Sequence, residues 1–175
     1  MNFQFYVEKL KHSDKFKKFE QKHKDAYFCS GFFVVDKEGK DNKFHLDYYL
    51  PKQDKIVSFQ LETAVQQNDV EIIDNKKPAK ANIDCDFEMD NIEKMIEKEM
   101  EKQGVKNKIQ KIMMSFQKID KKDYLICTVF ITMLGLLKVH INLDDKKIDL
   151  FEKKSVFDIM KVKKNGKNDS EQPVF

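Results

Sequence analysis

The chain has 175 residues, of which 36% are charged and 41% are hydrophobic, including 15 Phe. A chain of this length can bury roughly two-thirds of the surface that it exposes when unfolded, and its content of large apolar residues excludes disorder along the whole chain. The formal net charge of +3 is too small to indicate a polyanionic partner by itself. We therefore expect a soluble globular protein.

All 33 basic residues are Lys, because no Arg occurs in the sequence. The guanidinium group of Arg binds carboxylates, phosphates and guanine through two parallel hydrogen bonds, and a lysine ammonium cannot replace that geometry. Reading of a DNA sequence and phosphoryl transfer are therefore disfavoured.

The three cysteines are Cys29, Cys85 and Cys127. An odd set without close spacing argues against a disulfide framework and against a zinc ribbon. The first residues also lack the basic and then hydrophobic pattern of a signal peptide. We therefore expect a reducing, cytoplasmic location.

Two helices are predicted at the start of the chain, followed by a meander of three antiparallel strands. Ser13 can cap the second helix. In the clearest strand, residues 43–50, apolar residues alternate with His45, Asp47 and Tyr49. The strand before it, around Cys29, is apolar on both faces, as expected of a central strand that is covered on each side. The apolar residues at helical spacing are Phe3, Tyr6, Val7, Leu10, Phe16 and Phe19.

The second half begins with another helix, for which Asp90 and Glu93 fit a capping box and Gly104 marks the end. A strand is predicted at residues 109–119 from its alternating pattern. The apolar run at residues 124–137 is too short to span a membrane. Its β-branched residues, with a turn near Leu134 and Gly135, predict a buried hairpin instead. The apolar stripe of the helix consists of Ile92, Met95, Ile96 and Met100.

Three sequence blocks recur in the same order in the two halves. Residues 24–35 match residues 122–133, and the matches continue with 43–47 against 138–142 and 55–59 against 147–151. We infer an internal duplication; the alternative is chance agreement in a sequence rich in Lys, Ile and Phe.

The predicted fold class is α+β, with two pseudo-repeated units that each consist of a helix followed by an antiparallel β-meander. The units span residues 1–62 and 88–162. Residues 63–87 form a linker with an edge strand at residues 70–73. A short helix is predicted at residues 155–162, and residues 163–175 are expected to be a disordered tail.

Two successive units of a helix and a meander resemble the tandem arrangement of the β-lactamase inhibitor proteins and, more loosely, paired PepSY or cystatin-like domains. The resemblance concerns architecture and is carried by the helix and strand pattern above, without a signature motif. It implies an α+β fold and assigns no site residue, because fold likeness alone does not assign a function.

His45 and His140 occupy equivalent positions of the repeat, on the less apolar face of their strands. They are candidates for a metal or acid/base site, with Asp47 and Asn142 beside them. The alternative is a repeated strand residue without a special role. No metal or cofactor is predicted, because the spacings that place two His ligands together on one strand or helix are missing. Cys29 and Cys127 are expected in the core, and Cys85 is expected to be the most accessible thiol.

Lysines also cluster with aromatic residues between residues 15 and 28, a pattern that can bind single-stranded nucleic acid. Phe16 and Phe19 keep helical spacing, however, which places them in the core and disfavours nucleic acid. The function predicted first is a non-enzymatic interaction module that binds a protein partner or self-associates through its sheet surface. The alternatives are a small metal-dependent hydrolase that uses His45 and His140, and a single-stranded nucleic-acid binder. No membrane partner is expected.

Overall fold

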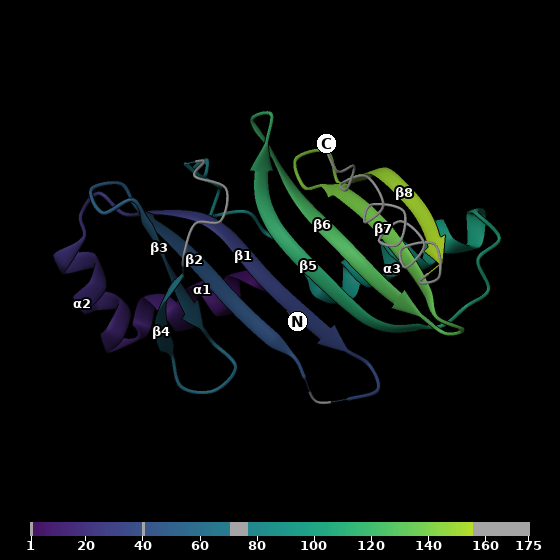
Figure 1. Cartoon of the computed structure of the whole chain (residues 1–175), viewed down its shortest axis with the longest axis horizontal. Coiled ribbons are helices and arrows are strands. Elements are labelled where there is room, and N and C mark those ends of the chain that lie inside the picture. The colour runs from purple at the N-terminus through teal and green to yellow at the C-terminus, as the bar shows by residue number, and fades with distance from the viewer. Residues whose placement is uncertain (1, 40, 71–76, 156–175) are drawn as a thin grey trace, which may run out of the picture.

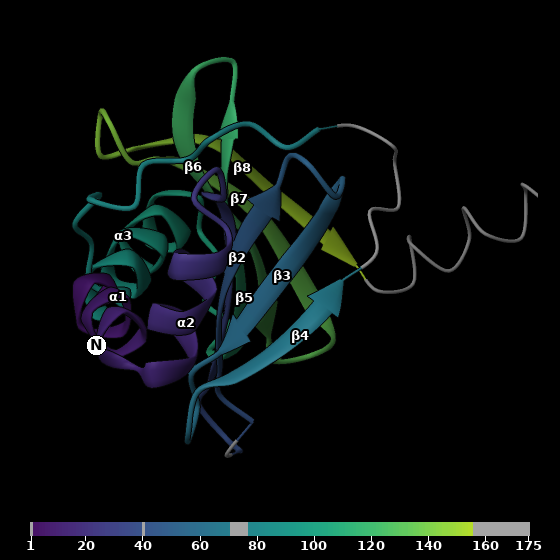
Figure 2. The ribbon, with the colours of Figure 1, turned by 90° about the vertical axis from the view of Figure 1, so that its left-hand side faces the viewer.

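The computed structural model of the chain describes residues 2–39, 41–70 and 77–155. In these ranges the elements are α1 (Phe3–His12), α2 (Asp14–Lys22), β1 (Tyr27–Asp36), β2 (Lys43–Leu50), β3 (Lys55–Gln60), β4 (Gln66–Val70), α3 (Met89–Lys102), β5 (Ile109–Ile119), β6 (Lys122–Ile131), β7 (Gly135–Asn142) and β8 (Lys147–Ser155). The strands form one antiparallel sheet in the order β4-β3-β2-β1-β5-β6-β7-β8 (Figure 1). All three helices lie against the same face of this sheet (Figure 2).

Helices α1 and α2 form as the sequence predicts, with local caps. Asn2 Oδ1 accepts a hydrogen bond from Gln4 N at 2.7 Å at the start of α1. The Ser13 hydroxyl donates to Leu10 O at 2.8 Å and accepts from Phe16 N at 3.2 Å. One residue therefore satisfies backbone groups at the end of α1 and at the start of α2.

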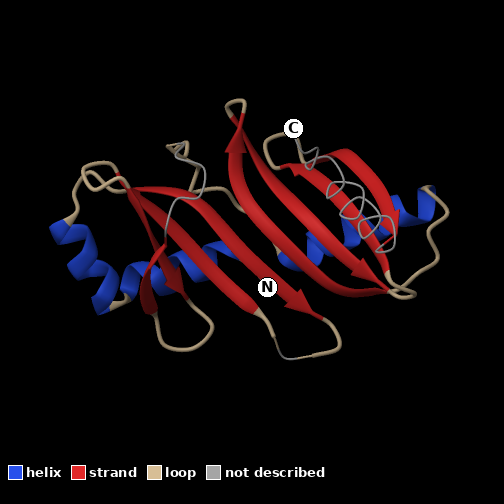
Figure 3. Ribbon diagram, viewed as in Figure 1, coloured by secondary structure: helices blue, strands red, loops and turns tan. Residues whose placement is uncertain are grey.

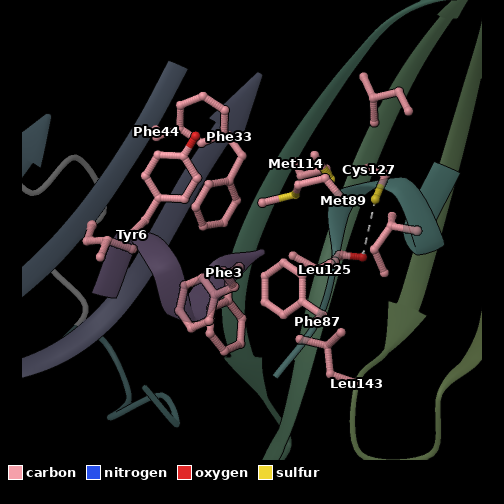
Figure 4. Close-up of a cluster of buried hydrophobic side chains, with 14 of the residues drawn as sticks. Phe3, Tyr6, Phe33, Phe44, Phe87, Met89, Met114, Leu125, Cys127 and Leu143 are labelled. Atoms are coloured by element: carbon pink, nitrogen blue, oxygen red, sulfur yellow. Dashed lines mark hydrogen bonds between the residues drawn. The ribbon is translucent and has the colours of Figure 1, made fainter. Parts of the chain in front are cut away.

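The core lies between the helices and the sheet and is rich in aromatic rings (Figure 4). The Phe3 ring of α1 is fully buried and stacks on Phe87 with 4.8 Å between ring centroids. It meets Phe33 of β1 and Phe116 of β5 edge to face, at 5.9 and 5.5 Å. The cluster therefore joins residues from both halves of the chain in one core.

Two four-stranded meanders, β1–β4 and β5–β8, make up the sheet, and they join along β1 and β5 (Figure 3). The predicted α+β class with an antiparallel sheet is confirmed. The two pseudo-repeated units are not confirmed, because the matched sequence blocks align β1 with β6, and β5 lies between those two strands. The strands that open the two meanders are β1 and β5.

The start of α3 differs from its prediction. The helix begins at Met89 with Glu88 as N-cap, and no side chain caps it, so the predicted capping box at Asp90 and Glu93 is wrong. Phe87 and Met89 are buried on either side of Glu88, and Phe87 O accepts a hydrogen bond from Phe3 N at 3.0 Å. Tertiary contacts therefore set this helix start in place of a local cap.

The predicted hairpin at residues 124–137 is confirmed as β6 and β7, with its turn at residues 132–134. The edge strand is β4, which overlaps its prediction only at Val70, and residues 71–73 lie outside the described residues. The predicted terminal helix and tail also lie outside them from residue 156 onward. Among the described helices, none has both the length and the apolar composition needed to cross a bilayer.

Candidate functional site

The face of the sheet opposite the helices, here called the uncovered face, carries none of the three described helices (Figure 2). Side chains alternate between the two faces of a strand, so the register assigns each residue to one of them. Phe33 and Phe116 point to the helices and belong to the core. Phe32 of β1 therefore points to the uncovered face, where it pairs with Ser115 of β5, which in turn pairs with Ile126 of β6.

Apolar side chains occupy the middle of the uncovered face. They do not belong to the core between sheet and helices, yet most of them are only half-buried. Val34 is the most buried of the group, with 4% of its surface exposed. The group, here called the central apolar patch, consists of Phe32, Val34, Met113, Ile126 and Phe130.

A shallow hollow of about 610 Å³ lies at the end of this patch. Met113 and Phe130 line it together with Lys111 and Asp36. Lys111 Nζ lies 3.4 Å from Asp36 Oδ2, so these two charges are paired with each other. The hollow therefore offers apolar contacts beside a neutralised ion pair.

A polar cluster centred on Asp47 lies on the β1–β2–β3 side of the patch. Ser30 Oγ donates to Asp47 Oδ2 at 2.8 Å, and Ser58 of β3 lies opposite Asp47 in the pairing of β2 with β3. Burial raises the pKa of the Asp47 carboxyl above its usual value, while hydrogen bonds from Ser58 and Ser30 and the nearby His45 oppose the rise in pKa. The cluster therefore holds a carboxyl group that water solvates poorly.

His45 lies beside this cluster and binds a carboxylate of its own. Its Nε2 lies 2.9 Å from Glu62 Oε1, and the same oxygen accepts a hydrogen bond from Phe44 N at 2.9 Å. The His45 ring also lies 6.0 Å from the Phe32 ring, measured between centroids. Glu62 thus fixes the orientation of the imidazole at the border of the central apolar patch.

The structure does not bring His45 and His140 together. Both point to the uncovered face, as predicted, but they lie on β2 and β7, with β1, β5 and β6 between them. Four strand spacings separate them by roughly 19 Å, so one metal ion cannot bind to both within a single chain. Among the described residues there is no group of three His, Cys, Asp or Glu side chains that could hold a metal ion.

His140 has a separate environment. It pairs with Ile126 of β6 and with Leu150 of β8, and its Nε2 is buried without a hydrogen-bond partner among the described residues. Burial lowers the pKa of His140, and the charge of Lys138 lowers the pKa further. These surroundings therefore favour the neutral form of the imidazole.

The three thiols are all poor nucleophiles. Burial raises the pKa of Cys29 to about 12, with a smaller contribution from Asp47, and burial raises the pKa of Cys127 to about 12. Cys85 is the least buried of the three, as predicted. Burial is nevertheless the main cause that raises its pKa to about 11, and Asp123 adds to the rise. A thiolate is the reactive form, so none of these cysteines is activated.

The aromatic residues of the predicted nucleic-acid surface are mostly inaccessible. Phe16, Phe19 and Phe28 are buried in the core, so their rings cannot stack on bases. Tyr27 is half-buried, and its hydroxyl donates to Pro78 O at 2.8 Å. Within the described residues, no stacking platform therefore lies beside the lysines of α2.

The central apolar patch was not predicted as a site. The sequence signal was present, because β1 and β6 are apolar on both faces. That pattern predicts a strand covered on each side, whereas the described helices cover only one side of the sheet (Figure 2). Periodicity reports how apolar a face is and does not report what lies against it.

No protein-family model and no curated protein sequence matches the chain. A solved structure of a "putative lipoprotein" from Clostridium difficile 630 has a similar fold, with a TM-score of 0.52 over 81% of this chain and 91% of that chain. Only 11% of the aligned residues are identical, so this likeness concerns the fold alone. The predicted resemblance to the β-lactamase inhibitor proteins and to paired PepSY domains is not confirmed, because no comparison assigns the chain to a family.

Proposed function

We propose that the protein is a non-enzymatic interaction module that binds a protein partner through the uncovered face of its sheet. The observation that carries this proposal is the central apolar patch, whose half-buried side chains lie opposite the helices. Contiguous apolar surface of this kind marks interaction sites on soluble proteins. The internal duplication predicted from the sequence remains part of the proposal, because two related meanders would build such a face from two halves.

The size of the face fits a protein partner. Eight strands about 4.8 Å apart give a sheet roughly 34 Å wide, and a strand of eight residues is about 26 Å long. The resulting area is close to the roughly 800 Å² that each partner contributes to an interface of standard size. The uncovered face is therefore large enough to provide one side of such an interface.

The charges around the patch favour a partner without strong net charge. Lys111 is paired with Asp36, Lys43 Nζ lies 3.5 Å from Asp41 Oδ1, and Lys154 Nζ lies 3.5 Å from Glu152 Oε2. An apolar centre with a polar rim is the usual anatomy of a protein–protein interface. It is unlike a nucleic-acid site, which needs unpaired basic groups along its length.

We also propose a cytoplasmic location, which rests on the three free thiols. The solved structure of similar fold is named a "putative lipoprotein", and at 11% identity that name does not carry over to this chain. The hydrolase alternative has no support from the geometry, because His45 and His140 lie on strands that are four positions apart.

The experiment compares two Phe→Lys variants during purification of crosslinked complexes from the protein's own cells. Phe32→Lys places a charge in the central apolar patch, whereas Phe5→Lys changes a residue of α1 that is 60% exposed. We expect one protein to be captured with the wild type and with Phe5→Lys, and to be lost with Phe32→Lys. Ile126→Lys serves as a second variant of the patch, and thermal melting checks that each variant is folded.

Two other outcomes would change the conclusion. Capture of the same proteins by Phe32→Lys and Phe5→Lys would contradict binding through the uncovered face. A wild-type dimer in analytical ultracentrifugation that Phe32→Lys converts to a monomer would identify a second copy of the chain as the occupant.

A further inference from the structure

The turn between β6 and β7 carries two exposed apolar side chains. Met133 is 91% exposed and Leu134 is 61% exposed, and both residues have positive φ, 61° and 54°. Apolar side chains stabilise the fold only when they are removed from water, so these two exposed side chains do not. The left-handed backbone region is also unfavourable for residues with a Cβ. Folding alone therefore does not account for Met and Leu at this turn.

The other turns of the sheet provide an internal comparison. Among the described residues, six non-glycine residues have positive φ. Four of them are charged, namely Asp54, Asp120, Lys121 and Lys146, and the other two are Met133 and Leu134. The β5–β6 turn is the closest match, because Asp120 and Lys121 are consecutive and both have positive φ, 47° and 69°. The β6–β7 turn therefore differs from the other turns in having apolar side chains at these positions, while its backbone conformation is shared with them.

The base of the β6–β7 turn is held rigidly. Thr132 N donates to Lys108 O at 2.9 Å, and Lys108 N donates to Thr132 Oγ1 at 3.1 Å. Asn107 Nδ2 donates to Thr132 O at 2.8 Å. A Cβ at Gly135 would lie 2.7 Å from Ile131 Cγ1, so the strand that follows is also closely packed. Met133 and Leu134 are therefore presented by a preorganised support.

Exposed lysines surround this support. Lys106 and Lys108 belong to the segment that holds Thr132, and Lys153 lies on β8 opposite Leu137. None of these three lysines forms an ion pair within the described part of the chain. The α3 carboxylates Glu97 and Glu101 line a hollow together with Lys106 and Lys108, so the local net charge is small. The lysines can orient the turn on an anionic surface, but attachment requires the apolar pair.

We propose that the β6–β7 turn binds a membrane surface that contains anionic lipids, with Met133 and Leu134 inserted among the headgroups and the three lysines next to lipid phosphates. A protruding apolar pair needs a complementary pocket in a protein, whereas the interface of a bilayer accepts it without one. Apolar insertion combined with basic residues is the general mode of peripheral membrane binding. This proposal goes beyond the function proposed above and replaces the expectation that the protein has no membrane partner.

The test is co-sedimentation of the full chain with vesicles of phosphatidylcholine alone or of phosphatidylcholine with phosphatidylglycerol. The wild type is expected to bind the anionic vesicles more tightly, and less tightly as salt is added. Met133→Asn combined with Leu134→Gly should weaken binding about tenfold or more, because it removes the inserted side chains. The same double variant should melt at or above the wild-type temperature, since Asn and Gly tolerate positive φ, so loss of folding cannot explain loss of binding.

The matched control is Asp120→Asn combined with Lys121→Gly, which introduces the same Asn-Gly pair at the opposite end of β6 and leaves the net charge unchanged. It should bind vesicles like the wild type. Phe32→Lys should also bind them, which separates this proposal from the one on the uncovered face. Replacing Lys106, Lys108 and Lys153 by Gln should remove the preference for anionic vesicles.

Either of two results would overturn the proposal. The first is no binding of the wild type to anionic vesicles at low salt. A turn that binds a pocket in a protein instead of a membrane would also give this result. The second is unchanged binding of the Met133→Asn, Leu134→Gly variant, which would assign the interaction to lysines elsewhere in the chain.

Discussion

Replacement of Phe3 by Ala tests whether one aromatic cluster holds both halves of the sheet together. Phe3 is fully buried, and its ring contacts Phe87 at 4.8 Å, Phe116 at 5.5 Å, Phe33 at 5.9 Å and Phe28 at 6.3 Å between centroids. These partners come from β1, from β5 and from the segment before α3. The substitution therefore leaves a cavity at the junction of the two meanders.

The expected cost in the free energy of unfolding is about 4 kcal/mol, the middle of the range for Phe→Ala in a core. In a domain of this size each kcal/mol lowers the melting temperature by about 2–4 °C, so a drop of roughly 8–16 °C should follow. Phe5→Ala is the control, because Phe5 lies on the same helix and is 60% exposed. Its effect should stay within about 0.5 kcal/mol.

The assay is urea denaturation monitored by circular dichroism, with thermal melting as a second measurement. A cost for Phe3→Ala below about 1 kcal/mol, or a cost equal to that of Phe5→Ala, would refute the placement of Phe3 at the centre of the core. Two separate transitions in the wild type would show that the halves unfold independently. If Phe3→Ala does not fold, Phe3→Leu should still show a smaller cost of about 1–2 kcal/mol.

Two further predictions concern the sheet. A Cβ at Gly31 would lie 2.8 Å from Phe33 Cζ, so Gly31→Ala should cost about 1–3 kcal/mol by overpacking, and urea denaturation measures it. Burial raises the pKa of the Asp47 carboxyl in the folded state. The folded protein therefore binds this proton more tightly than the unfolded chain does. The stability that this group contributes is lost as the pH rises from the unfolded-state pKa through the folded-state pKa. Asp47→Asn should therefore melt at a higher temperature than the wild type at pH 7, with a difference that narrows in acid; a lower melting temperature at pH 7 would contradict this account.

Most elements were predictable because their apolar residues follow a strict period. The spacing of Phe3, Tyr6, Val7 and Leu10 predicts α1, and all four side chains are buried. The failures have a different physical origin. Helix α3 starts at Met89 because Phe87 and Met89 pack into the core, and a local capping pattern carries no information about such contacts.

For the candidate sites, too, local periodicity was predictable and the arrangement of the strands was not. Alternation along β2 and β7 correctly places His45 and His140 on one face, because the side-chain period of a strand is two. Their separation depends on the strand order, in which β5 lies between β1 and β6. The sequence matches suggested that β1 and β6 are equivalent, and equivalence does not specify which strands are neighbours.

The two proposed surfaces are compatible with each other in space. Met133 and Leu134 lie at the end of β6 and β7, so a membrane bound there would meet the strands end on. The normal of the sheet would then lie roughly parallel to the membrane plane. The central apolar patch would point sideways and stay open to a protein partner. The Met133→Asn, Leu134→Gly variant should therefore weaken only membrane binding, and the Phe32→Lys variant should disrupt only binding of the protein partner.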